Sequence, residues 1–219
     1  MEESEATLAP PKPRLRGVSH EIAAFAMPVL GLVAFALAST ASVRWAVVVY
    51  TAGVTMMYTT SAVYHRGHWS KSTRLRLRRL DHSMIMIAIA ATYTPVAVAA
   101  LDTSSARILL AVVWSLALVG VVLQMLWLHA PRWLVAGLYI GIGWTALAFL
   151  PTLWRDLGLV SFSLLLLGGV VYSIGAVVYS TRRPDPVPTV FGFHEVFHAL
   201  VIAAGLVFYA AILRVVVTQ

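Results

Sequence analysis

Seven long apolar runs, separated by short polar connections, constrain this chain more than any other feature of its sequence. The hydrocarbon core of a bilayer is roughly 30 Å thick, so a helix that crosses it needs about 20 apolar residues. The runs are continuous rather than alternating, which favours helices over the strands of a membrane barrel. We therefore expect an all-α integral membrane protein, a bundle of seven transmembrane helices. The runs cover approximately residues 22–39, 45–64, 82–100, 106–128, 133–150, 157–180 and 193–216.

The composition excludes several other classes of protein. Hydrophobic residues make up 60% of the 219 residues and charged residues 11%, against roughly 45–50% and 25% in soluble domains. A disordered chain would show the opposite bias, and the absence of cysteine excludes a secreted disulfide scaffold. A net charge of +7 is compatible with nucleic-acid binding. On so apolar a chain we expect the basic residues to mark one side of a membrane instead, with no nucleic-acid partner.

The distribution of Lys and Arg predicts how the chain is oriented. Twelve of these residues fall on the side of the N-terminus, and four, Arg44, Arg107, Arg155 and Arg214, fall on the other. The positive-inside rule then places the N-terminus in the cytoplasm, and seven spans place the C-terminus outside. The basic connection Arg66–Arg79 is explained equally by this rule and by contact with anionic lipid head groups.

These observations predict a simple domain organisation. Residues 1–16 are rich in Glu, Pro and basic residues and are expected to form a disordered cytoplasmic tail. Residues 17–219 form the predicted seven-helix domain. The expected location is a membrane that the chain crosses several times.

Histidines gather at the predicted cytoplasmic ends of the spans, and three of them suggest a metal site. His194 and His198 are four residues apart, so on a helix they face the same way and two imidazoles can bind one zinc ion. Packing alone is the other explanation, but unpaired imidazoles within a span would lack water partners. His65 ends the second run at the same depth. Three protein ligands with an open fourth position are typical of catalytic zinc.

Asp81 and Ser61 are expected at the same depth as these histidines. A carboxylate at Asp81 could hold a water or act as general base, and Ser61 lies one turn before His65. Each also has a structural explanation. Asp81 opens the predicted third span, where the helix dipole favours negative charge, and Ser61 could bond to its own helix backbone. For Glu21 and Glu195 the dipole explanation is preferred.

Other polar and small residues are assigned structural roles at this stage. His82 is expected in helix packing, and His68 and His129 in interfacial connections. Gln124 and Arg214 are expected at the outer side of the bilayer, as a packing hydrogen bond and an interfacial anchor. Two glycine pairs are expected to permit close helix packing: Gly141 with Gly143, and Gly168 with Gly169.

Four motifs, in order along the chain, carry a resemblance to a known family. They are Ser61–His65, Arg78–Ile85, Ala91–Pro95 and Phe193–His198. With them the chain resembles the hemolysin III group of bacterial membrane proteins from about Arg14 to Arg214. That group belongs with the progestin and adipoQ receptors, which include the adiponectin receptors.

The resemblance implies a seven-helix fold with a cytoplasmic N-terminus and a zinc ion near the cytoplasmic face. It also implies the plasma (inner) membrane of a bacterial type of cell as the location. By position it implies His65, His194 and His198 as ligands, Asp81 as the holder of the zinc-bound water, and Ser61 as the motif serine beside them. The chain departs from the family pattern at three positions. Pro13 and Arg16 stand where many members have Glu and Asn, and Phe208 stands where a further histidine is frequent. None of these departures removes a predicted ligand.

Three functions are compatible with these features. The first is a zinc-dependent hydrolase of a lipid amide, ceramide-like because the constellation resembles that of alkaline ceramidases, with a membrane lipid as substrate. The second is a non-catalytic sensor or regulator of membrane fluidity and lipid homeostasis, in which the zinc is structural. A pore-forming cytolysin ranks last, because no charged stripe lines any span. The sequence predicts no particular oligomeric state.

Overall fold

The structure is a computed structural model that describes residues 12–127 and 130–218. The described chain is helical, and its only β pairing is an isolated bridge between Val187 and Phe191. The predicted all-α class is therefore confirmed. The elements are α1 (Val18–Leu37), α2 (Ala41–Arg66), α3 (Lys71–Ala100), α4 (Thr103–Leu126), α5 (Arg132–Gly143), the short 3-10 helix η1 (Thr145–Phe149), α6 (Leu150–Thr181) and α7 (Phe193–Thr218).

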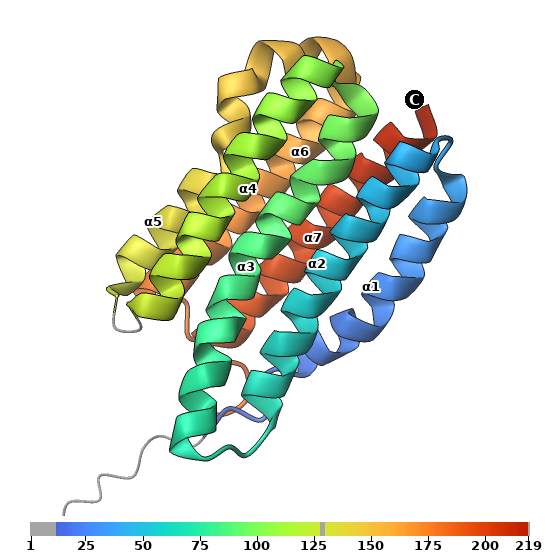
Figure 1. Ribbon diagram of the computed structural model, residues 1–219. Helices are drawn as coiled ribbons and strands as arrows, with labels where there is room; N and C mark the ends of the chain where they lie inside the picture. Colours follow the sequence, from blue (N-terminus) through green and yellow to red (C-terminus); the bar gives the residue numbers. More distant parts are fainter. Residues whose placement is uncertain (1–11, 128–129, 219) are drawn as a thin grey trace, which may run out of the picture.

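Among the described residues, six helical stretches are long and apolar enough to cross a membrane, which supports a multi-pass membrane protein. One of them is the 50-residue stretch Arg132–Thr181, which joins α5, η1 and α6. Figure 1 shows that the chain rises along α5, reverses at the top of the view and returns along α6. Gly158, with φ +67°, interrupts α6 near this reversal, and glycine tolerates a positive φ that other residues rarely adopt.

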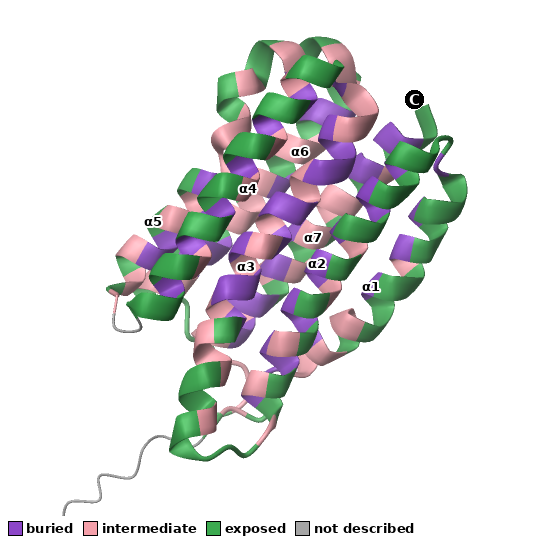
Figure 2. Cartoon of the chain, in the orientation of Figure 1, coloured by how far each residue is buried: buried purple, intermediate pink, exposed green. Residues whose placement is uncertain are grey.

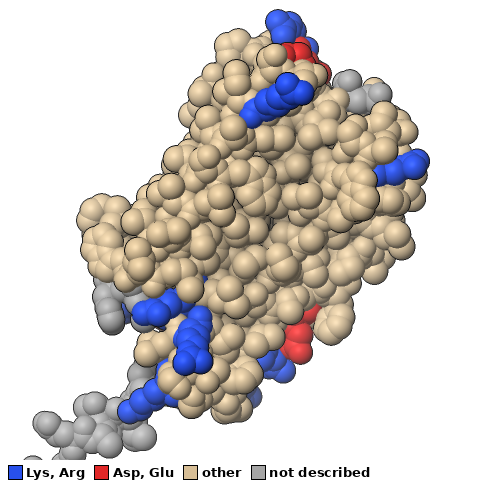
Figure 3. All heavy atoms as spheres, in the orientation of Figure 1, with Lys and Arg blue, Asp and Glu red and all other residues tan. Residues whose placement is uncertain are grey.

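The surface between the two ends of the bundle is apolar, as contact with lipid requires. Large side chains such as Phe25, Leu32 and Leu118 are exposed on it. Figure 3 shows basic and acidic side chains gathered at the two ends of the molecule, with an almost uncharged band between them. Charged groups therefore avoid the region that would lie in hydrocarbon.

The interior is built around α2, α3 and α7, where small side chains let the helices approach closely. Figure 2 shows buried positions concentrated on these helices, while α1 is largely exposed. A Cβ on Gly53 of α2 would lie 2.6 Å from the Cβ of Ala91 on α3, and one on Gly168 would meet the Phe208 ring. The predicted packing role therefore holds for Gly168. It is wrong for Gly141 and Gly143, whose added Cβ would meet no described atom within 4 Å.

The third helix begins earlier than its apolar run predicts. Ser70 caps α3, accepting a hydrogen bond from the Thr73 backbone N–H at 3.3 Å, a common way for a helix to start. The basic connection is therefore helical over much of its length, which fixes the faces of α3 on which its Arg side chains lie.

Part of the predicted tail is described, and it lies against the segment that precedes α7. The backbone N–H groups of Arg14 and Leu15 donate to the carbonyls of Thr189 and Val190 at 3.0 and 3.1 Å. Arg16 forms an ion pair with Glu195. Residues 1–11, for which disorder is also predicted, lie outside the described residues.

Candidate metal centre

Three histidines from α2 and α7 meet at the lower end of the bundle. His65 lies in the last turn of α2, and His194 and His198 lie in the first two turns of α7. Each offers one nitrogen, and these atoms all lie within 4.8 Å of one another. The Nε2 atoms of His65 and His194 are 3.1 Å apart. The i, i+4 spacing on one helix supplies two donors, and the antiparallel neighbour supplies the third.

The environment of these imidazoles fits a metal ion. Only 7% of His65 and 2% of His198 is exposed, and Nδ1 of His198 is buried with no hydrogen-bond partner among the described residues. Burying a polar nitrogen without a partner is costly. Neutral imidazole nitrogens are ligands that zinc commonly takes in proteins, so this donor set suits zinc.

Asp81 completes the polar cluster from α3. One of its carboxylate oxygens, Oδ2, lies 3.8 Å from Nε2 of His65, and the residue is 7% exposed. Asp81 lies well inside α3, which begins at Lys71. Its placement at a helix start, one of the two explanations considered from the sequence, is therefore wrong, and the helix dipole does not account for a buried carboxyl at this position.

Ser61 of α2 and His20 of α1 form a buried pair beside the histidine cluster. Ser61 Oγ and His20 Nδ1 form a buried hydrogen bond of 2.8 Å, so the serine side chain pairs with another helix. The His20 ring stacks on that of His198, with centroids 3.8 Å apart. His20 therefore orients the ring of His198, a role that its isolated position in the sequence did not reveal.

Gly17 lets the start of α1 approach His65 closely. Its φ is +81°, and a Cβ there would lie only 2.7 Å from the Cβ of His65. A larger residue would be strained by the positive φ and would also displace His65. The sequence carried no signal for this role, because the contact joins two helices.

Glu195 and Glu21 have the structural surroundings expected of them. Glu195 Oε2 accepts a hydrogen bond from the Gly192 backbone N–H at 2.8 Å, which caps α7 from within its first turn, and its other oxygen pairs with Arg16. Glu21 pairs with Arg66 at 2.9 Å, and both side chains are about half exposed. Neither acid belongs to the histidine group.

Gln124 is placed differently from the sequence-based expectation. Its Nε2 lies 2.9 Å from Nδ1 of His82, so it is at the same end of the bundle as the metal centre, whereas the sequence-based expectation put it at the opposite end. The reason is the direction of α4, whose last turn returns to the end that bears the metal centre. His82 also accepts a hydrogen bond at its carbonyl from the Tyr139 hydroxyl, at 3.2 Å. His129 lies outside the described residues.

An apolar cavity of about 480 Å³ opens from the histidine cluster into the bundle. Its volume falls within the roughly 300–1,000 Å³ of small-molecule sites. His198 and Asp81 line it near the metal centre, and Leu147, Leu153 and Phe162 line it farther along. The cavity therefore leads from three clustered imidazoles and a carboxyl into a space suited to a hydrocarbon chain.

The fold and the cluster together define a multi-pass membrane protein with a candidate three-histidine metal centre. A family described as "Haemolysin-III related" matches residues 8–209, and the chain belongs to this family. It is 32% identical over 172 residues to "Hemolysin-3 homolog" of Bacillus subtilis (strain 168), covering 77% of this chain and 78% of that protein. It is 31% identical over 176 residues to "Hemolysin-3" of Bacillus cereus, covering 80% and 76%. No solved structure matches.

Proposed function

We propose that the chain crosses the membrane seven times, with its N-terminus in the cytoplasm. A helix of 50 residues would be about 75 Å long, far longer than the roughly 30 Å of the hydrocarbon core. The stretch Arg132–Thr181 has 50 residues and reverses its direction between α5 and α6. Both facts support two crossings of the membrane by this stretch. The excess of Lys and Arg near the metal centre supports a cytoplasmic location for that end.

We further propose that the protein is a zinc-dependent hydrolase of a lipid amide, ceramide-like in its linkage. The observation that carries this proposal is the place of the three histidines. They lie beside a buried carboxyl, Asp81, at the end of an apolar cavity. The cavity would hold an acyl chain with its carbonyl at the polar cluster.

The side chains divide the work of such a site. His65, His194 and His198 would hold zinc, which when bound supplies a Lewis acid that polarises a carbonyl and makes water more acidic. Asp81, whose Oδ2 lies 3.8 Å from Nε2 of His65, is placed to accept a proton as general base. Ser61 orients His20 through a hydrogen bond, and the His20 ring stacks on that of His198. The pair thereby positions His198 as a metal ligand.

A structural zinc in a sensor of membrane fluidity or lipid homeostasis is the second candidate. It is favoured by the contacts of His65 with the rings of both His194 and His198, because an ion held by all three would tie α2 to α7. In that case the metal would matter for stability, and Asp81 would have no part in turnover.

The test compares metal content with turnover in the purified protein. We expect about one equivalent of zinc in the wild type and its loss in His65→Ala. Asp81→Asn should retain zinc and lose at least about a hundredfold in hydrolysis of a ceramide, the loss typical of removing a general base. Zinc is measured by elemental analysis and hydrolysis by release of the free fatty acid.

The matched control is Asp156→Asn, which alters a carboxylate paired with Arg155 near the start of α6, at the other end of the bundle. It should change neither zinc content nor hydrolysis. Zinc-loaded, folded wild type that releases no fatty acid from any of a broad panel of lipid amides and esters would overturn the hydrolase proposal. Chelation that lowers the thermal midpoint of that inactive protein would favour the structural role.

A further inference from the structure

A second hollow, of about 500 Å³, lies on the other side of the histidine cluster and is strongly basic. No Asp or Glu is among the described residues that line it. Figure 3 shows basic side chains gathered at this end of the molecule. The cationic side chains that line the hollow are Arg16, Lys71, Arg74, Arg78 and Arg132.

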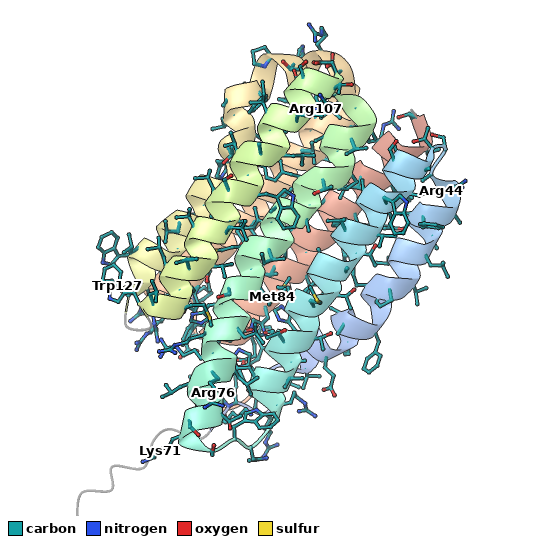
Figure 4. All side chains as sticks on the ribbon, in the orientation of Figure 1. Arg44, Lys71, Arg76, Met84, Arg107 and Trp127 are labelled. Atoms are coloured by element: carbon teal, nitrogen blue, oxygen red, sulfur yellow. The ribbon has the colours of Figure 1, made fainter. Side chains whose placement is uncertain are left out.

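Three of these cations form one stripe on α3. Lys71, Arg74 and Arg78 are spaced by three and four residues, which places them on one helix face, and all three line the hollow. Arg76 lies on the same helix between them but is exposed and does not line the hollow. Figure 4 labels Lys71 and Arg76 at this end of the bundle. Positive charge on α3 is therefore directed toward the hollow by helix geometry, and Arg76 is its natural control.

The guanidinium of Arg132 approaches the hollow from α5. Its Nη1 is buried and makes no hydrogen bond to the residues that the structure describes. The guanidinium lies over the Tyr179 ring, with Cζ 5.8 Å from the ring centroid. A buried guanidinium N–H without an acceptor is costly, so an anionic oxygen in the hollow would satisfy it.

Two acidic side chains at this end are already paired with arginines, and one of these arginines, Arg16, lines the hollow. Glu195 pairs with Arg16, and Glu21 pairs with Arg66. No ion pair within the described chain involves Arg74, Arg78 or Arg132. These three arginines therefore carry uncompensated positive charge around one hollow.

The positive field also acts on Lys12, which lies outside the membrane-spanning helices. Partial burial, followed by the charges of Arg16, Arg66 and Arg74, lowers the pKa of Lys12 from its usual value. Like charges disfavour a further cation in this way. The same field would attract an anion.

The basic hollow and the apolar cavity meet at the metal centre. His82, Tyr179 and His194 line both spaces. His65 lines only the basic hollow, and His198 lines only the cavity. A ligand that occupied both would have an anionic group among the arginines, a hydrocarbon chain in the cavity, and its linking group at the three histidines.

We propose that the basic hollow binds the phosphate group of a single-chain amphiphile whose acyl chain lies in the apolar cavity. Arg78 and Arg132 are the central contacts, because guanidinium groups bind phosphate oxygens through paired hydrogen bonds. The inference deepens the proposed hydrolase function, on which it rests only for the position of the scissile bond. Binding needs no turnover, so it can be tested separately.

The experiment measures equilibrium binding of radiolabelled lysophosphatidate to the purified protein in an uncharged detergent. A monoacylglycerol with the same acyl chain is the neutral probe, and inorganic phosphate is the probe without a chain. We expect lysophosphatidate to bind at least about tenfold more tightly than the monoacylglycerol, because its phosphate would form charge-assisted hydrogen bonds that the neutral lipid lacks. Inorganic phosphate should compete only at much higher concentration.

Arg78→Gln and Arg132→Gln should each weaken lysophosphatidate binding by about tenfold or more and leave monoacylglycerol binding unchanged. Arg76→Gln should leave both unchanged. Thermal midpoints establish that the variants fold. Equal binding of the charged and neutral lipids would overturn the proposal, as would equal losses in Arg76→Gln and Arg78→Gln, which would indicate general surface charge.

Two further outcomes show whether the acyl chain contributes to binding and whether the phosphate is bound by the arginines or by the metal. Inorganic phosphate that binds as tightly as lysophosphatidate would show that the cavity adds nothing and would overturn the amphiphile assignment. The binding is also repeated after zinc is removed with a chelator. Complete loss on chelation, with no effect of Arg78→Gln or Arg132→Gln, would assign the phosphate to the metal and not to the arginines. Binding that persists after chelation supports the proposal.

Discussion

The hydrogen bond between Ser61 and His20 holds two buried polar side chains beside the metal centre. The two residues are each 2% exposed, and the bond length is 2.8 Å. The other ring nitrogen of His20, Nε2, already lacks a partner among the described residues. The serine is thus the contact that compensates the burial of the His20 imidazole.

We expect Ser61→Ala to lower the free energy of unfolding by about 1–3 kcal/mol, because it leaves the buried Nδ1 of His20 unpaired. The midpoint of thermal unfolding in detergent measures the effect. Zinc content should persist, since Ser61 is not among the proposed ligands. The matched control is Ser83→Ala. Ser83 Oγ is buried and unpaired within the described chain, so its removal should be neutral or slightly stabilising, and equal losses in both variants would contradict the assignment.

The close approach of helices α2 and α3 sets the position of His65, on α2, relative to Asp81, on α3. The two helices touch where Gly53 meets Ala91, which is fully buried. Both functional side chains lie on these helices toward the lower end of the bundle, so their relative position depends on how closely the helix axes approach. Neither the Cβ of Ala91 nor a Cβ added at Gly53 could move by rotation of a side chain.

We expect Gly53→Ala to force α2 away from α3 and to lower the free energy of unfolding by about 1–3 kcal/mol, as overpacking does. Zinc affinity should fall with it, because His65 moves with α2. Thermal unfolding and metal titration are the measurements. Gly141→Ala, where the new methyl group meets no described atom within 4 Å, serves as the control, and the hypothesis fails if the two substitutions behave alike.

The two ends of the whole molecule differ in charge, and this difference sets the proposed orientation. Arg76 and Arg107 mark opposite ends in Figure 4, and the end that bears Arg76 also bears the metal centre. Twelve Lys and Arg residues belong to that end by the sequence-based count and four to the other. The proposal therefore requires the metal centre to face the cytoplasm.

The chain has no cysteine, so single cysteines can report this orientation. We expect Ser104→Cys, exposed at the start of α4, to react with a membrane-impermeant maleimide in intact cells. Arg76→Cys should react only after the cells are permeabilised. Labelling is read from a shift in mass on a gel. The reverse pattern would place the metal centre outside and contradict the proposed topology.

The sequence by itself determined the helical class, most helix positions and the candidate ligands. The continuous apolar runs are about as long as a helix needs to cross the hydrocarbon core of a bilayer. His194 and His198 are four residues apart, so they share a helix face whatever the tertiary structure. Local pattern also failed in identifiable places. The apolar run hid the early start of α3, because its first turns are basic. Gln124 was assigned to the wrong end of the bundle, although the fourth of seven spans, counted from a cytoplasmic N-terminus, ends on the cytoplasmic side.

Only the tertiary structure decided which side chains from separate helices meet. It paired Ser61 with His20, brought Asp81 within 3.8 Å of His65, and turned Lys71, Arg74 and Arg78 toward one hollow beside Arg132. The physical reason is that a hydrophobic pattern specifies how a helix faces lipid or interior. Distances between helices depend instead on packing at contacts such as Gly53 against Ala91. Those contacts join residues far apart in the chain, so no local pattern records them.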